Sequence, residues 1–206
     1  KIRSALEFVA SVQRIIDLKP EILITGHGEP IRGSDKIVTD LTRIRDGVLH
    51  IHDETVRGMN EGKDVFTLMR EIRLPEHLSL GEGHGKVAWN VRSIWEEYAG
   101  WFHFDSTTSL YAVPVSAIAG DLVEAAGGSA PLVKRAADHI KAGRPLEAIH
   151  LLNVVNRGDA QDESSLTVEL SALERLLSDS QRANLSETMW LSAEIDRVQE
   201  NLRSRA

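Results

Sequence analysis

Residues 22–31 read ILITGHGEPI, and their pattern indicates the fold class of the first part of the chain. Its apolar, partly β-branched run is short and lies between Pro20 and Gly26, which favours a buried strand over a helix. An amphipathic helical pattern precedes it over about residues 4–18 and stops before Pro20. A helix, a strand and a glycine-rich loop in this order are typical of an α/β fold.

His27 directly follows the expected strand and is the strongest candidate for chemistry in the chain. Functional groups of α/β sheets lie beyond the carboxyl ends of the strands, and the flanking glycines allow a sharp turn that leaves space beside the imidazole. From the spacing alone, His27 is either a metal ligand or a loop histidine whose neighbours only form a turn. One histidine cannot hold a catalytic zinc ion, which takes about three protein ligands.

The composition narrows the classes of partner and ligand. The 206 residues include 31 acidic and 24 basic side chains, for a net charge of -7, which argues against a nucleic-acid or anionic-membrane partner. No window approaches the roughly 18 to 20 apolar residues of a membrane span. The chain has no cysteine, so disulfides are excluded and any metal must be held by His, Asp or Glu.

After about residue 60 the sequence contains no convincing strand, so we expect the α/β pattern to give way to helices. A helical stripe runs from Ser34 to a break at Gly62. Shorter helices are expected at 64–72, 86–102, 114–126, 131–142, 145–157, 162–178 and 183–203. The predicted fold class is therefore mainly α, with a short α/β part (1–60) followed by an all-helical part (61–206).

The segment Leu132 to Arg157 reads as two antiparallel helices and resembles one tetratricopeptide hairpin. Its expected packing positions are Ala136, Ala137, Ile140, Ala148, Leu151 and Leu152. Such hairpins bury their faces against neighbouring copies. No second copy follows at a fixed period, so we expect a tetratricopeptide-like unit and not a repeat array.

The Gly26-His27-Gly28 turn resembles the last metal-binding motif of the metallo-β-lactamase fold, where a Gly-His-Gly turn supplies the final histidine of a two-metal site. The likeness to alkylsulfatase-type members continues along the chain at Arg45-Asp46, Ile51-His52-Asp53, Thr55, Met59-Asn60, Trp89, Asn90, Tyr98, Gly100-Trp101-Phe102 and Ala126-Gly127-Gly128. It covers nearly the whole chain, from the end of the catalytic domain (1–60) to a helical dimerisation domain (61–206).

This resemblance implies a function for the longer protein that we expect the chain to come from. His27 would be one ligand of a two-zinc centre that hydrolyses a small-molecule ester, an alkyl sulfate among the candidates. The remaining ligands, a His-x-His-x-Asp-His loop and acidic bridging residues, would lie upstream of Lys1, and the helical part would form a homodimer. The alternative is a helical oligomerisation or binding module without catalysis, because the chain itself holds only one credible ligand.

His50, His52 and Asp53 imitate a metal motif but lie inside the long expected helix. Side chains two positions apart on a helix diverge by about 200° and cannot converge on one ion. We therefore expect His52 and Asp53 to form hydrogen bonds on the helix surface or between domains.

A second Gly-His-Gly, at Gly83-His84-Gly85, follows no expected strand. In alkylsulfatase-like proteins the corresponding loop approaches the mouth of the active site, is rich in tyrosine and carries a basic residue suited to a sulfate group. Here Glu82 stands in the loop, and because a carboxylate repels sulfate, this departure argues against a sulfate ester while leaving the hydrolase class unchanged. His84 is either a substrate contact or general acid, or a solvated loop residue.

Asn90 and Arg92 open the helix after this loop and are the expected substrate-binding residues, because polar donors near a helix N-terminus can hold an anion. The alternative for Arg92 is a structural ion pair. The same region holds most of the aromatic residues, namely Trp89, Trp95, Tyr98, Trp101, Phe102 and Phe104. These side chains form either core or a subunit contact, or they line an apolar channel for an alkyl chain.

Overall fold

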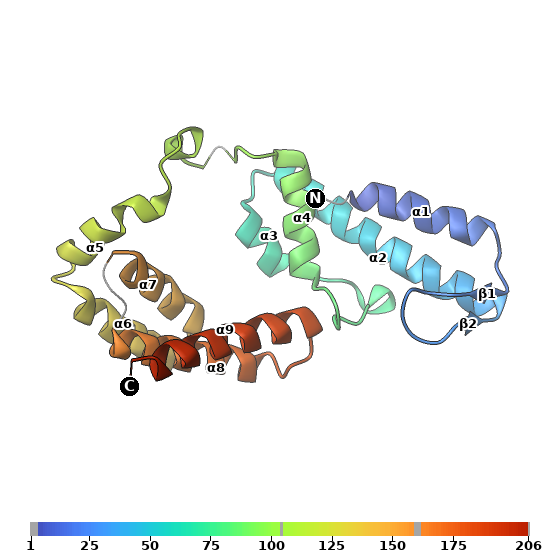
Figure 1. Cartoon of the computed structure of the whole chain (residues 1–206). Helices are drawn as coiled ribbons and strands as arrows, with labels where there is room; N and C mark the ends of the chain where they lie inside the picture. The colour runs from blue at the N-terminus through green and yellow to red at the C-terminus, as the bar shows by residue number, and fades with distance from the viewer. Residues whose placement is uncertain (1–3, 104, 159–161, 206) are drawn as a thin grey trace. The chain divides into compact units, whose positions relative to one another are not determined.

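A computed structural model describes residues 4–103, 105–158 and 162–205. The chain forms two compact units that divide between His103 and Phe104, and each unit is described by itself. Helices dominate both units (Figure 1), so the expected mainly α fold is confirmed. Of the helices in the described ranges, none has the length and the apolar run that crossing a bilayer requires.

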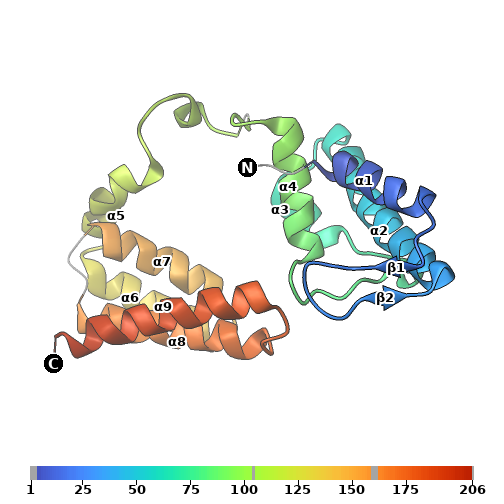
Figure 2. The same ribbon diagram turned by 45° about the vertical axis from the view of Figure 1, so that its right-hand side comes forward.

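The first unit is built around one long helix, α2. Its elements are α1 (Ala5–Asp17), β1 (Ile22–Leu23), β2 (Ile31–Arg32), α2 (Ser34–Asn60), α3 (Val65–Glu71), the 3-10 turn η1 (Glu76–Leu78) and α4 (Val87–Ala99). Helix α1 lies along α2, and α4 packs on both α2 and α3 (Figures 1 and 2). The shared core consists of Ala5, Ile51, Leu68, Ile72, Val91 and Ile94.

A glycine in α2 allows α3 to approach closely. A Cβ atom built on Gly58 would overlap the side chain of Leu68, and Leu68 is buried at 2% exposure. Close approach of this kind requires the residue without a side chain. The contact explains why α3 joins the unit formed by α2.

The compact units divide later in the chain than the boundary expected near residue 60. Helices α3 and α4 share the core of α2, so residues 61–103 belong with the first unit. The family resemblance predicts a different boundary, between a catalytic-domain part (1–60) and a helical dimerisation part (61–206). That boundary stays a prediction.

The expected buried strand over residues 21–25 is wrong for the described part of the chain. β1 is two residues long and pairs antiparallel with β2, with Ile22 opposite Arg32 and Leu23 opposite Ile31. Ile22 is 48% and Ile24 is 78% exposed. A buried strand needs neighbours on its edges and faces, and in the described residues β1 has only this two-residue partner.

The second unit is a helical assembly. Its elements are the 3-10 turns η2 (Thr107–Leu110) and η3 (Val115–Ile118), followed by α5 (Ala119–Ala125), α6 (Ser129–Lys141), α7 (Pro145–Gly158), α8 (Glu163–Asp179) and α9 (Leu185–Arg203). Each of α6, α7 and α8 packs against the next helix in the chain (Figure 2). The helix expected from Pro114 starts instead as a 3-10 turn, and its α-helical part begins at Ala119.

The expected hairpin over 132–157 is confirmed as α6 and α7. Their contact uses Val133, Ala136, Ala148 and Leu152, all buried. Its likeness to a tetratricopeptide unit stays a prediction. A second core, with Leu166, Leu173, Leu177, Leu191 and Val198, joins α8 to α9.

Local caps fix several helix starts near the expected positions. The carboxylate of Asp64 accepts a hydrogen bond from the Thr67 amide at 3.0 Å, at the start of α3. Asn184 does the same for the Glu187 amide at 3.0 Å, at the start of α9. Such side chains satisfy amides that the first helical turn leaves without a partner.

Candidate functional site

His27 lies in the loop between β1 and β2, and its side chain is exposed. The Thr25 hydroxyl donates a hydrogen bond to the His27 carbonyl at 2.6 Å, and Gly28 has a φ of 83°. That backbone angle strongly favours glycine, so the sharp turn expected beside the imidazole is present. Among the described residues, no three or more His, Cys, Asp or Glu side chains lie together in a way that could hold a metal ion. The role of His27 as a ligand therefore stays a prediction.

The loop that carries His84 is exposed and is tied to α4 by its acidic residue. Oε1 of Glu82 accepts a hydrogen bond from the backbone amide of Val87 at 2.7 Å, at the first residue of α4. A carboxylate is favoured there by the helix dipole. The departure from the family pattern at Glu82 thus has a structural role, and an anion at this helix end would compete with that carboxylate.

The structure does not bring Asn90 and Arg92 together. The Asn90 amide nitrogen donates to the Lys86 carbonyl at 3.1 Å. Nε of Arg92 donates to Glu96 at 3.0 Å, one helical turn further along. Arg92 thus forms a structural ion pair, which was the alternative expected from the sequence. Its role as a substrate ligand stays a prediction.

Asn90 lines a surface hollow of about 400 Å³ in the first unit. Its lining comes from α1, α2 and α4 together with the cap of α1, and consists of Ser4, Ala5, Phe8, Val48, Asn90, Ser93 and Ile94. An apolar floor with a few polar groups is the usual character of a small-molecule site. Of these residues the sequence pointed only to Asn90, because no spacing in it indicates that α1 and α4 line one hollow.

His52 forms the polar link between α2 and α4. His52 is 8% exposed. Nδ1 lies 2.8 Å from a carboxylate oxygen of Asp53, and Nε2 lies 2.7 Å from the hydroxyl of Tyr98. Nε2 of His50 lies 3.2 Å from the Arg73 carbonyl. The expected hydrogen bonds of His52 and Asp53 are confirmed, within one compact unit.

The aromatic residues near α4 divide between core and surface. Trp95 packs against the core of the first unit, with its ring 4.8 Å from that of His103 in an edge-on contact. Trp101 is 77% exposed. Phe104 lies outside the described residues. The described aromatic side chains thus divide between core and surface, and a channel for an alkyl chain stays a prediction.

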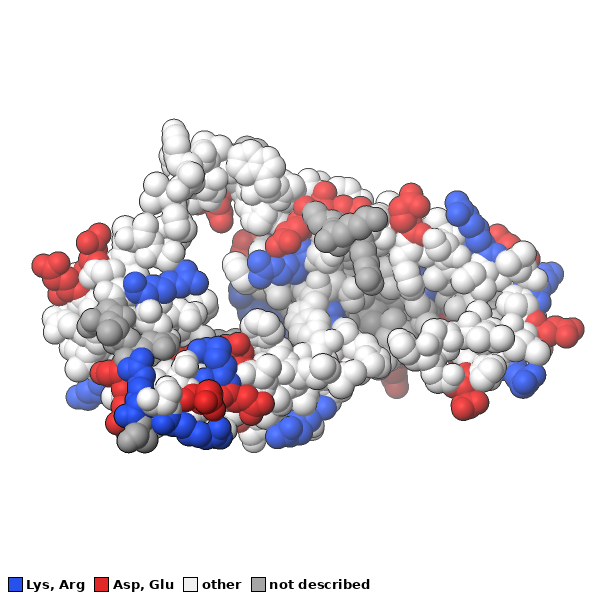
Figure 3. Space-filling model, in the orientation of Figure 1, with Lys and Arg blue, Asp and Glu red and all other residues white. Residues whose placement is uncertain are grey.

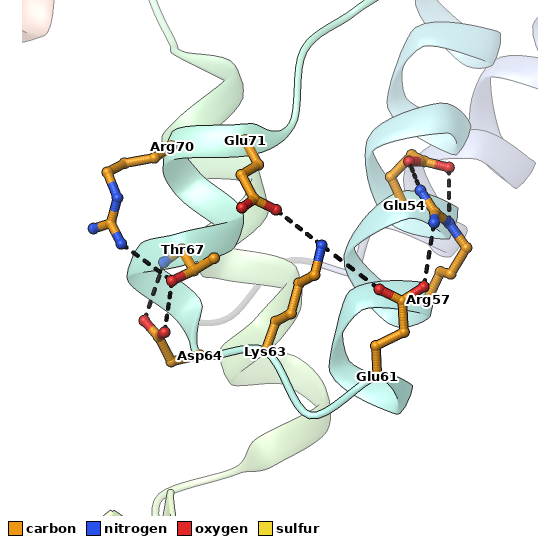
Figure 4. Close-up of polar contacts among 8 residues, drawn as sticks. All are labelled: Glu54, Arg57, Glu61, Lys63, Asp64, Thr67, Arg70 and Glu71. Carbon is orange, nitrogen blue, oxygen red and sulfur yellow. Dashed lines mark hydrogen bonds and ion pairs between the residues drawn. The ribbon is translucent and has the colours of Figure 1, made fainter.

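A network of charged side chains joins the end of α2 to α3 (Figure 4). Nζ of Lys63 lies 2.9 Å from Glu71 and 3.6 Å from Glu61, and Arg57 binds Glu54 and Glu61. The hydrogen bond to Glu71 raises the pKa of Lys63, and the hydrogen bond from Arg57 lowers the pKa of Glu54. Because these charges are paired with each other, the network stabilises the connection between α2 and α3.

The second unit exposes an apolar segment, residues 106–118, that contains no charged side chain. Its surface is white on the face shown in Figure 3. Its exposed large side chains are Leu110 (52%), Tyr111 (68%), Val113 (60%), Val115 (79%) and Ile118 (47%). Exposed apolar surface without charges is typical of a protein contact.

The fold and these surfaces are those of a helical protein with exposed apolar side chains, which is the class of protein that associates through such surfaces. The chain belongs to the alkyl sulfatase dimerisation family, whose model matches residues 67–197. The match begins in α3 and ends in α9, so it spans parts of both compact units.

Similar proteins include several alkylsulfatases. A linear primary-alkylsulfatase of a Pseudomonas species is 30% identical over 181 residues, covering 85% of this chain and 34% of that protein. An alkyl/aryl-sulfatase of Saccharomyces cerevisiae is 27% identical over 162 residues, covering 77% of this chain and 25% of that protein. The chain thus spans between a quarter and about a third of the length of these relatives.

A solved structure has the same fold. The sec-alkylsulfatase Pisa1 from a Pseudomonas species superposes with a TM-score of 0.79 at 24% identity, over 94% of this chain and 31% of that one. A double mutant of the same enzyme gives a TM-score of 0.80. The helical arrangement described above is therefore shared with that enzyme.

Proposed function

We propose that this chain is the C-terminal part of a homodimeric, zinc-dependent hydrolase of small-molecule esters, with alkyl sulfates as the first candidate substrates. The observation that carries the proposal is the family match over residues 67–197. The relatives named alkylsulfatases extend the likeness over most of the chain. The helical part provides the dimer contact, and residues 1–60 provide the last piece of the catalytic domain.

His27 is the residue of this chain that would hold zinc. Its imidazole is exposed in a turn shaped by Gly28, so the nitrogen is free to meet an ion held by ligands from elsewhere in the protein. Bound zinc supplies a water of lowered pKa for attack on the ester. The chain contributes one ligand of that centre, and two ions are expected by the family resemblance.

The hollow beside Asn90 suits the organic part of the substrate. Phe8, Val48 and Ile94 offer an apolar surface for an alkyl chain, and Asn90 and Ser93 offer polar hydrogen-bonding groups. Burial of methylene groups contributes roughly 0.8 kcal/mol each, so affinity should rise with chain length. His84 remains the candidate general acid.

The test uses the intact protein that contains this chain, with octyl sulfate and octyl acetate as substrates. Release of inorganic sulfate supports the sulfate ester, and cleavage of the acetate alone supports a carboxylic ester. We expect His27→Ala to lower turnover by more than about 100-fold, since even outer-shell partners of a metal ligand change activity by 10- to 100-fold. His77→Ala, an exposed histidine of η1, is the matched control and should keep full activity.

The alternative function is a helical association module without catalysis. It is favoured by one observation, that no metal-binding group of three or more side chains occurs among the residues described. An intact protein that forms dimers but cleaves neither ester, with zinc supplied, would favour this alternative.

A further inference from the structure

We propose that Asp53, His52 and Tyr98 form a nucleophilic relay in which the Tyr98 phenol oxygen accepts acyl groups from activated esters. The relay lies in the first unit, with Asp53 and His52 on α2 and Tyr98 on α4. It needs no metal and goes beyond the proposed zinc-dependent activity.

The carboxylate of Asp53 determines where the His52 ring carries its proton. An ionised carboxylate only accepts hydrogen bonds, so the contact of 2.8 Å to Nδ1 places the proton on that nitrogen. Nε2 of the neutral ring then has a lone pair, and the Tyr98 hydroxyl donates to it across 2.7 Å. The phenol proton therefore already points at a base.

This order of groups is that of an activated nucleophile. A hydroxyl within hydrogen-bond reach of a base, with the base oriented by a third group, is the arrangement that raises the reactivity of a weak nucleophile. His50 offers a contrast on the same helix. Its Nε2 faces the backbone carbonyl of Arg73 at 3.2 Å, so that nitrogen carries the proton and has no lone pair to serve as a base.

The three residues of the relay differ in exposure in a way that suits acyl transfer. His52 is 8% exposed, so water has little access to the base. Tyr98 is 50% exposed, so its side chain stands partly open to an ester in solution. The side chain of Asp53 is 64% exposed, so its carboxylate keeps its solvation while it orients the ring.

The step balances without any further reactant. The Tyr98 oxygen forms a bond to the ester carbonyl carbon while its proton passes to Nε2 of His52. The bond from that carbon to the alcohol oxygen then breaks, and the leaving alcohol takes the proton from Nε2. The products are an acylated Tyr98 and a free alcohol.

The chain contains two tyrosines, and the second is a built-in control. Tyr111 is more exposed, at 68%, and has no histidine partner among the contacts of the described residues. Exposure alone would make Tyr111 the faster target. The relay predicts the opposite order.

The experiment treats the full chain with p-nitrophenyl acetate in the presence of a chelator and follows acetylation of each tyrosine by peptide mass spectrometry. We expect Tyr98 to be acetylated at least about 10-fold faster than Tyr111, because a positioned general base contributes roughly 100-fold or more. Equal rates, or a slower Tyr98, would overturn the proposal without any variant. The chelator separates this result from the zinc-dependent activity.

Two variants test the order of the relay. His52→Gln should reduce acetylation of Tyr98 at least to the level of Tyr111 and leave Tyr111 unchanged. Asp53→Asn, at an exposed side chain that puts little of the fold at risk, should give an intermediate rate. If Tyr98 keeps its rate in both variants, with helical content preserved by circular dichroism, the base is not His52 and the proposal fails.

Discussion

Oε1 of Glu169 on α8 accepts a hydrogen bond from the guanidinium of Arg197 on α9 at 2.7 Å. Its other oxygen accepts from the Asn156 amide on α7 at 3.0 Å. Glu169 is 8% exposed. One buried carboxylate therefore joins three helices of the second unit, with its charge paired to Arg197 and its second oxygen bound by a neutral amide.

Removing this carboxylate should destabilise the second unit. We expect Glu169→Ala to lower the free energy of unfolding by about 2 kcal/mol, because a hydrogen bond to a charged group contributes roughly 1.5 to 3 kcal/mol and the Asn156 amide nitrogen loses its acceptor. Urea unfolding followed by circular dichroism measures the change. Glu174→Ala, at an exposed position of α8, should have little effect, and a similar loss there would contradict the assignment.

The cap of α3 should respond to acid. The Thr67 side chain and amide bind the Asp64 carboxylate and lower its pKa below the ordinary value of 3.8. Because the pKa of Asp64 is lower in the folded than in the unfolded state, the folded chain binds fewer protons there. The contribution of Asp64 to the free energy of unfolding is therefore complete above pH 3.8 and is lost as the pH falls through the lowered pKa. Thermal unfolding between about pH 2 and 6 measures this loss. Asp64→Asn keeps an acceptor without the charge, so it should flatten this part of the profile, and an unchanged acid limb would rule out the cap as its source.

Gly58 should not tolerate a side chain. A Cβ at this position overlaps Leu68 of α3, so Gly58→Ala must displace a buried leucine and should destabilise the first unit by about 1 to 3 kcal/mol. Gly120 is the matched control in α5, where a Cβ meets only a carbonyl oxygen at 3.8 Å. Gly120→Ala should be neutral or stabilising because alanine is the better helix former. Equal unfolding midpoints for the two variants would contradict the close packing of α3 on α2.

The helix starts could be predicted from sequence because their determinants are local. Asp64 and Asn184 bind amides three residues ahead, and the sequence shows such pairs directly. The ion pair of Arg92 with Glu96 is also local, since residues four apart meet on a helix. These features do not depend on the rest of the chain.

Burial and the site could be predicted only in part. The apolar run at Ile22 and Ile24 has the composition of a buried strand, but its burial depends on which segments cover it. The hollow beside Asn90 needs α1 to lie near α4, and no spacing in the sequence specifies that pairing. Tyr98 and His52 meet across 46 positions for the same reason.

Substitutions in the apolar segment 106–118 should separate a dimer into monomers. The segment exposes Val113 at 60% and Val115 at 79% without a charged residue between positions 106 and 118. The chain belongs to a dimerisation family, and a two-fold contact brings the same patch of both copies to one interface. A permanent interface covers on the order of 2,000 Å² or more, so the unmodified chain should stay dimeric at micromolar concentration.

A charge at each valine is placed twice in a two-fold interface, and each buried unpaired carboxylate weakens the interface further. We therefore expect the double variant Val113→Glu, Val115→Glu to elute as a folded monomer in size exclusion with light scattering. Leu146→Glu is the matched control, because Leu146 of α7 is 60% exposed but lies outside the segment. A dimer that survives the double variant, or one that is lost equally in the control, would place the contact elsewhere on the chain.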